Sequence, residues 1–298
     1  MAKTRHILKR ARAIRNIRTV TKAMQSVAAA RFKEIYDRIT EFTPFATHLL
    51  DMVGDLVSRS QVAEADHPLL AAPPDLRHDV LLVLTSNRGL CGSFNSGVLQ
   101  LALQRLQQLR QADYEVELHV VGARGVRYLR FLGLRVDKVH DDLPDVPDYP
   151  EAAILADRMM ASFLDGRISG LEIAYTQFVS SGQQHAAVVP LLPLGDLPTR
   201  GDADAEPELR LPYDFLPEPR QILLRLLPAT VRIKLFQCLL DSAAAEQFMR
   251  RTAMQAATDN ADDVLHDLKI LANRLRQMQI TTELSEIMGG RVGLDDKR

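Results

Sequence analysis

Residues 257–278 read ATDNADDVLHDLKILANRLRQM, and the spacing of their apolar side chains decides the fold. The apolar residues recur at steps that alternate between four and three, at Ala257, Ala261, Val264, Leu268, Leu271, Leu275 and Met278. This spacing is typical of the a/d seam of a left-handed coiled coil. Such a seam needs a second helix of comparable length against it.

The stretch belongs to a longer helical segment. No Gly or Pro occurs between Pro228 and Gly289, which predicts a helix of about 90 Å at 1.5 Å per residue. The first half of this segment is rich in alanine, as at Ala243, Ala244 and Ala245. Small side chains at a seam allow two helices to approach closely.

The N-terminal end carries the matching pattern. Apolar residues recur at helical spacing at Ile7, Ala11, Ile14, Ile17, Val20, Met24, Val27, Phe32, Ile35, Ile39 and Phe42, with no Gly or Pro before Pro44. Because both helices adjoin the same central domain, we expect them to be antiparallel, with facing residue numbers that add to about 277–286. A pair of ordinary bundle helices in a larger core remains an alternative.

The middle of the chain alternates between predicted strands and helices. Strands are expected at 79–85, 116–121, 134–136, 171–179 and 186–192, and helices at 93–110, 125–132 and 151–164. This alternation predicts an α/β sheet that is parallel at least in its first part. The predicted organisation is an N-terminal coiled-coil helix (1–60), a Rossmann-like α/β domain (78–195), an exposed connector (196–218) and a C-terminal coiled-coil helix (219–290). The fold class is thus α/β with a long antiparallel coiled coil.

Composition excludes few classes of protein. The 298 residues are 46% hydrophobic with a formal net charge of −1, and two cysteines are too few for a disulfide scaffold. No apolar run reaches the roughly 18 residues of a membrane helix. The first 33 residues contain ten Lys or Arg and no acid. This basic face suits a partner lined with carboxylates, while a transit peptide or a nucleic-acid-binding coiled coil remain alternatives.

Catalytic motifs are weak. The loop from Ser86 to Ser93 follows the first strand and contains two glycines, but neither G-x-G-x-x-G nor G-x-x-x-x-G-K-[ST] occurs. Cys91 has no adjacent histidine to activate it, and the eight histidines show no metal-ligand spacing. We therefore predict no catalytic, cofactor or metal site. A nucleotide-dependent enzyme that uses this loop remains the weakest alternative.

Three blocks of sequence resemble one family. Residues 17–30 read IRTVTKAMQSVAAA, residues 87–92 read NRGLCG and are followed by Phe94-Asn95, and residues 256–261 read AATDNA. Further along lie Arg276-Gln277, Ile280-Thr281 and ELSEI at 283–287. In this order the blocks resemble the γ subunits of F-type ATP synthases, at both ends and in the middle of the chain.

The resemblance implies a non-catalytic rotor, the central stalk of a rotary ATPase, without cofactors. Its partners would be the α and β subunits, the ε subunit and the membrane c-ring, at the cytoplasmic face of a bacterial plasma membrane or, as an alternative, an organellar inner membrane. The family's contacts with β-subunit loops carry over onto Arg276, Gln277, Thr281, Arg88 and Lys22.

A further contact follows from the expected register. Beyond the reach of the N-terminal helix, the other helix still carries Ile280, Leu284, Ile287 and Met288. Exposed apolar residues in such a cluster predict a binding surface, here the apolar bearing of a surrounding ring.

Overall fold

The computed structural model describes residues 2–59, 68–71, 76–180, 182–195 and 219–295. The chain forms two compact units. The helical unit comprises Met1–Ala28 with Arg251–Arg298, and the α/β unit comprises Ala29–Arg250. The expected connector at 196–218 lies outside the described residues.

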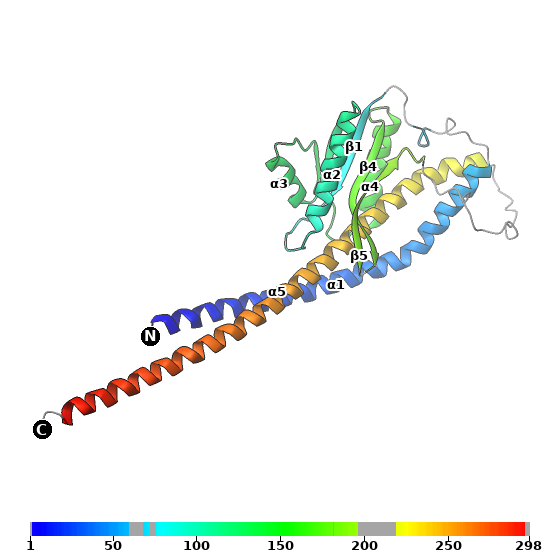
Figure 1. Cartoon of the computed structure of the whole chain (residues 1–298). Helices are drawn as coiled ribbons and strands as arrows, with labels where there is room; N and C mark the ends of the chain where they lie inside the picture. Colours follow the sequence, from blue (N-terminus) through cyan, green and yellow to red (C-terminus); the bar gives the residue numbers. More distant parts are fainter. Residues whose placement is uncertain (1, 60–67, 72–75, 181, 196–218, 296–298) are drawn as a thin grey trace. The chain divides into compact units, whose positions relative to one another are not determined.

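Two long helices run through both units (Figure 1). Helix α1 spans Ala2–Arg59 and helix α5 spans Pro219–Asp295. Each contains one proline, Pro44 in α1 and Pro228 in α5, which the helix accommodates although proline lacks a backbone N–H.

The α/β unit is built on one five-stranded sheet of order β3-β2-β1-β4-β5. The strands are β1 (His78–Leu84), β2 (Glu115–Val121), β3 (Lys138–His140), β4 (Gly170–Ser180) and β5 (Gln183–Leu192). Strands β1 to β4 pair in parallel and β5 pairs antiparallel to β4. The first five positions of the Rossmann strand order are the same, so the expected α/β class with a Rossmann-like domain is confirmed.

One predicted strand is displaced. The apolar residues at 134–136 were expected to form the third strand, which instead begins at Lys138. Gly133 ends the preceding helix with a positive φ of 74°, and Leu134 and Val136 then pack into the core between α2 and the sheet. Their side chains therefore pack on the face of the sheet that α2 and α3 cover, and the chain pairs with β2 only from Lys138 onward.

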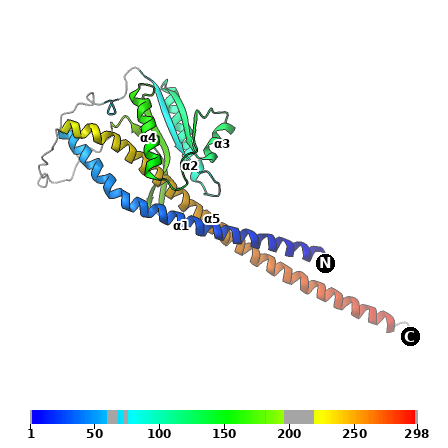
Figure 2. The same ribbon diagram turned by 180° about the vertical axis from the view of Figure 1, so that it is seen from behind.

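Each face of the sheet is covered by different helices (Figures 1 and 2). Helices α2 (Phe94–Gln111) and α3 (Ala123–Phe131) pack on the face that carries Leu81 and Val83. Helix α4 (Tyr149–Leu164) packs on the face that carries Val80 and Leu82, where it joins one large apolar core with the parts of α1 and α5 that belong to this unit. No described helix is long and apolar enough to cross a membrane.

Candidate functional site

The residues expected to contact partners lie in both units. Arg88 belongs to the loop after β1 in the α/β unit, and Lys22 to α1 in the helical unit. The remaining residues lie near the end of α5 in the helical unit: Arg276, Gln277, Ile280, Thr281, Leu284 and Ile287.

Polar contacts set the register of the helical unit. The hydroxyls of Thr21 and Thr258 are 2.8 Å apart and both side chains are buried. Arg18 forms an ion pair with Asp262, and Gln25 donates a hydrogen bond to Gln255. The numbers of the facing residues add to 279 or 280, within the expected range. As the numbers rise along α1 they fall along α5, so the pair is antiparallel.

The seam agrees only in part with the one predicted: Ile7, Ala11 and Ile14 of α1 are half-buried, as are Ala257, Val264 and Leu275 of α5. Ile17, Val20 and Val27 of α1 are each more than half exposed, and so is Met278 of α5, while Leu271 is 44% exposed. The buried residues of the seam include Thr21, Ala28, Met254, Thr258, Ala261 and Leu268. Apolar residues occur on more than one stripe of each helix, and the buried stripe is the one that includes Thr21 and Thr258. Ala261 and Leu268 alone among the α5 residues of the predicted seam are buried.

The end of α5 exposes the predicted contact residues. Arg276, Gln277, Ile280, Thr281 and Leu284 are all exposed, and the side chain of Ile287 lies outside the described part of the chain. The same register places Ala2, the first described residue of α1, opposite residues 277 and 278. Ile280 and Leu284 therefore lie past the point where described residues of α1 face α5. The hydroxyl of Thr281 donates to the carbonyl of Gln277 at 3.0 Å, which orients it along the helix.

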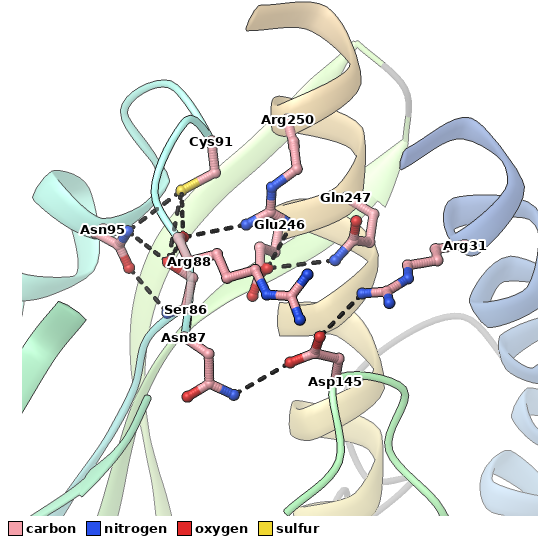
Figure 3. A network of polar contacts seen from close by, with 10 residues as sticks. All are labelled: Arg31, Ser86, Asn87, Arg88, Cys91, Asn95, Asp145, Glu246, Gln247 and Arg250. Carbon is pink, nitrogen blue, oxygen red and sulfur yellow. Dashed lines mark hydrogen bonds and ion pairs between the residues drawn. The ribbon is translucent and has the colours of Figure 1, made fainter. Parts of the chain in front are cut away.

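The loop that contains Arg88 is fixed by side chains at its base (Figure 3). The backbone N–H of Ser86 donates to Asn95 Oδ1 at 2.9 Å, and Asn95 Nδ2 donates to Ser86 Oγ at 2.7 Å and to Cys91 Sγ at 3.2 Å. Cys91 is buried, so it serves as a packing residue. Leu90 has a positive φ of 65° and is 62% exposed. The loop thus holds an apolar side chain outward in a backbone conformation that is unfavourable for leucine.

Helix α5 anchors the same loop. Arg250 Nη1 lies 2.6 Å from Glu246 Oε1, and Arg250 Nη2 donates to the carbonyl of Arg88 at 3.2 Å. Burial raises the pKa of Glu246, although the Arg250 guanidinium opposes this. In Rossmann-like sheets, ligands bind where the order of the strands reverses, outside their carboxyl ends. Here Arg250 reaches the loop at the carboxyl end of β1, the strand at which the order reverses.

A second chain of contacts connects α1 to the loop (Figure 3). Arg31 Nη1 pairs with Asp145 Oδ2 at 2.9 Å, and Asn87 Nδ2 donates to Asp145 Oδ1 at 3.1 Å. Burial would raise the pKa of Asp145, but these hydrogen bonds outweigh it and the pKa is lowered. Sequence reasoning missed Arg31, Asp145, Glu246 and Arg250. A signal was present for the last two, since they are an i, i+4 charge pair after the alanine run 243–245.

Other buried titratable groups of the α/β unit lie on α5 and on the strands β2 and β3. Burial raises the pKa of Asp241 on α5 to about 7 and that of the Cys238 thiol to about 12. His119 and His140 lie 3.4 Å apart between their ring nitrogens, although the sequence showed no metal-ligand spacing. Burial lowers the pKa of His140 to about 4. Within the described part of the chain, no group of three His, Cys, Asp or Glu could hold a metal ion.

Comparison with known proteins identifies relatives over nearly the whole chain. The family model described as ATP synthase matches residues 3–294. The ATP synthase gamma chain of Rhodopirellula baltica is 37% identical over 292 residues, which cover 97% of this chain and 98% of the relative. The ATP synthase gamma chain of Gemmatimonas aurantiaca is 36% identical, with 97% and 98% covered.

Solved structures show the same fold. A chain from the Euglena gracilis mitochondrial ATP synthase, in a structure of OSCP, F1 and c-ring, aligns with a TM-score of 0.64 at 16% identity, covering 98% of this chain and 95% of that one. A chain from the central stalk and c-ring of the Tetrahymena thermophila mitochondrial ATP synthase aligns with a TM-score of 0.53 at 21% identity, covering 80% and 99%.

Proposed function

This chain belongs to the family of ATP synthase gamma chains, and from that membership we propose that it is the rotor, or central stalk, of a rotary F-type ATPase. It couples ion movement through the membrane sector to ATP synthesis or hydrolysis in partner subunits. The observation that carries this function is the antiparallel pairing of α1 and α5 in the helical unit, which gives the chain a shaft. Family membership disfavours the alternatives of a nucleic-acid-binding coiled coil and a nucleotide-dependent enzyme.

The chain itself is a non-catalytic subunit, and catalysis belongs to the β subunits. Its partners are the α and β subunits, the ε subunit and the c-ring. The complex is associated with a membrane. Because the two gamma chains that are 36–37% identical to this chain come from bacteria, we place the complex at the cytoplasmic face of a bacterial plasma membrane.

For the chain's organisation, we propose that the helices at 1–60 and 219–290 form the coiled coil. The α/β domain at 78–195 and a connector at 196–218 complete the chain. The exposed end of α5 is the proposed contact with the surrounding ring, through Arg276, Gln277, Ile280, Thr281, Leu284 and Ile287. Lys22 and Arg88, both exposed, are proposed as further contacts with β-subunit loops.

Arg276 provides the test. An arginine side chain offers a planar fork of donors to a carboxylate or a carbonyl group, and loss of a buried contact of this kind costs about 2–5 kcal/mol. In a complex reconstituted from the α, β and ε subunits with this chain, Arg276→Ala should lower the ATPase turnover. The helicity of the isolated variant should match that of the unmodified chain.

The matched control is Arg225→Ala, an exposed arginine on the same helix but in the α/β unit. This variant should keep the turnover of the unmodified complex. Full turnover of the Arg276→Ala complex would refute the contact at Arg276. A chain that fails to assemble with the α and β subunits at all would refute the rotor function.

A further inference from the structure

An open groove lies between α2 and α3 on the outer side of the α/β unit. Its volume is about 810 Å³. Facing positions at helical spacing line it, with Leu99 and Leu103 on α2, and Arg124, Arg127, Tyr128 and Phe131 on α3. Figure 1 shows α3 beside α2. The rotor function proposed above assigns no role to these residues.

The exposed side chains of α3 are unusual for a solvated surface. Phe131 is 84% exposed, and Tyr128 and the following Leu132 are each nearly half exposed. Soluble surfaces rarely gather large apolar residues in this way unless the patch binds something. Aromatic residues and arginine are the side chains most enriched at protein interfaces and at their energetic hot spots.

The charged side chains that line the groove, Arg124 and Arg127, are all positive. Helix α3 carries Arg124, Arg127 and Arg130, and neither α2 nor α3 contains Asp or Glu. All three arginines are exposed, and no carboxylate among the described residues forms a salt bridge with them. By contrast, the nearby Arg105 of α2 pairs with Glu172 at 2.5 Å. The α3 arginines therefore offer guanidinium groups that are free to meet an acidic partner.

Helix α3, which forms one wall of the groove, is fixed in place by contacts with the rest of the α/β unit. Arg124 packs against Gly89, where a Cβ atom would lie 2.6 Å from the Arg124 guanidinium. The backbone N–H of Arg124 donates to the carbonyl of Ser86 at 3.1 Å. Leu129 of α3 is buried in the core against the sheet. Helix α3 is thus held at its start and along its inner face, while its outer face remains open.

From these observations we propose that the α2–α3 groove is a docking surface for an acidic protein segment. The segment inserts an aliphatic or aromatic side chain between α2 and α3, against Leu103 and Tyr128. Its carboxylates pair with Arg124 and Arg127. Phe131 closes over the segment at the rim. A small anion would leave this exposed apolar rim unused, which favours a polypeptide.

A photo-crosslinking experiment tests the proposal on the full chain. The variant Phe131→benzoylphenylalanine is irradiated with a short fluorescein-labelled peptide of glutamate and leucine. We expect crosslinking that falls about tenfold when Arg127→Glu is added, a loss that corresponds to about 1.4 kcal/mol. The control Arg110→Glu removes an arginine of α2 that does not line the groove and should leave the yield unchanged.

Two further arms of the experiment test whether capture is specific to the groove and to acidic peptides. Benzoylphenylalanine at Val179, an exposed apolar residue of β4, should capture little peptide. A peptide in which lysine replaces glutamate should not react at position 131. Crosslinking that does not depend on Arg127 would overturn the proposal. Phosphatidylglycerol vesicles form the last arm. The proposal would also be overturned if benzoylphenylalanine at position 131 crosslinked to lipid of these vesicles and not to the acidic peptide.

Discussion

The same two helices are held together by different forces in the two units of the chain. In the α/β unit, α1 and α5 contact each other through aromatic rings, with Phe42 and Phe236 at 4.9 Å between centroids, and both helices share a core with the sheet. In the helical unit they meet at a narrow seam that includes Thr21 and Thr258. The numbers of the facing residues add to 278–280 in both units. The pairing register of α1 and α5 is therefore the same in both units. The apolar surface that the two helices bury is larger in the α/β unit, where they share the core with the sheet.

The difference predicts unequal local stability. Burial of apolar surface contributes about 25 cal/mol per Å², so the α/β unit gains most from its core. A helix pair with a narrow seam buries less apolar surface, so its local unfolding costs less free energy. Under the proposed function, partner subunits contact the helical part and supply further burial of apolar surface upon assembly.

The largest effect should come from one substitution made in both units. Leu235 of α5 is fully buried in the α/β unit, while Leu284 of the same helix is 56% exposed in the helical unit. Leu235→Ala should lower the free energy of unfolding by about 2–5 kcal/mol, because it leaves a cavity. Leu284→Ala should change it by less than about 0.5 kcal/mol. Urea denaturation of the isolated chains measures both, and equal losses would contradict the comparison.

A buried acid gives the next largest effect. The pKa of Asp241 is raised by burial from 3.8 to about 7. Between these values the unfolded chain loses its proton and the folded chain keeps it, so the free energy of unfolding falls as the pH rises from about 4 to 7. Asp241→Asn removes this titration. The variant should gain about 2 kcal/mol more over the unmodified chain at pH 8 than at pH 5.

The control for Asp241 lies on the same helix in the other unit. Asp267 is exposed, so Asp267→Asn should shift the free energy of unfolding about equally at both pH values. Thermal melts at pH 5 and pH 8 give both differences. A gain from Asp241→Asn that does not depend on pH would show that the carboxyl is not held in its protonated form by the fold.

The polar seam of the helical unit should give a smaller effect. A double-mutant cycle of Thr21→Val and Thr258→Val isolates their hydrogen bond, for which we expect a coupling of about 1 kcal/mol. Amide hydrogen exchange of the helical unit is the suitable measurement, since this unit should open locally. Thr19→Val serves as a control, because Thr19 is exposed and bonds only to the backbone of its own helix among described partners. A coupling near zero would assign the register to other contacts.

Sequence alone predicted the helices and the class of the sheet well, because both depend on periodicity. The antiparallel register also followed, since chain connectivity constrains it. Which stripe is buried could not be read from the pattern: Val20 and Thr21 are both compatible with helical spacing, and only the partner decides between them. The contacts of Asp145 with Arg31 and Asn87 were likewise beyond prediction, because they join side chains from distant parts of the chain. For Arg250 the sequence indicated only its pairing with Glu246, and not its hydrogen bond to the loop.

The register itself can be tested with the smallest perturbation of the fold. It places Ile7 opposite residues 272 and 273, so Ile7→Cys with Ala272→Cys should form a disulfide within one chain upon oxidation. Leu284 lies twelve residues further along α5 than Ala272, about 18 Å at 1.5 Å per residue. A disulfide requires Cα atoms within about 7 Å, so Ile7→Cys with Leu284→Cys should form none within the chain. The native Cys91 and Cys238 are buried and do not compete. Electrophoresis without reductant distinguishes the outcomes, and an internal disulfide at position 284 would contradict both the register and the free end of α5.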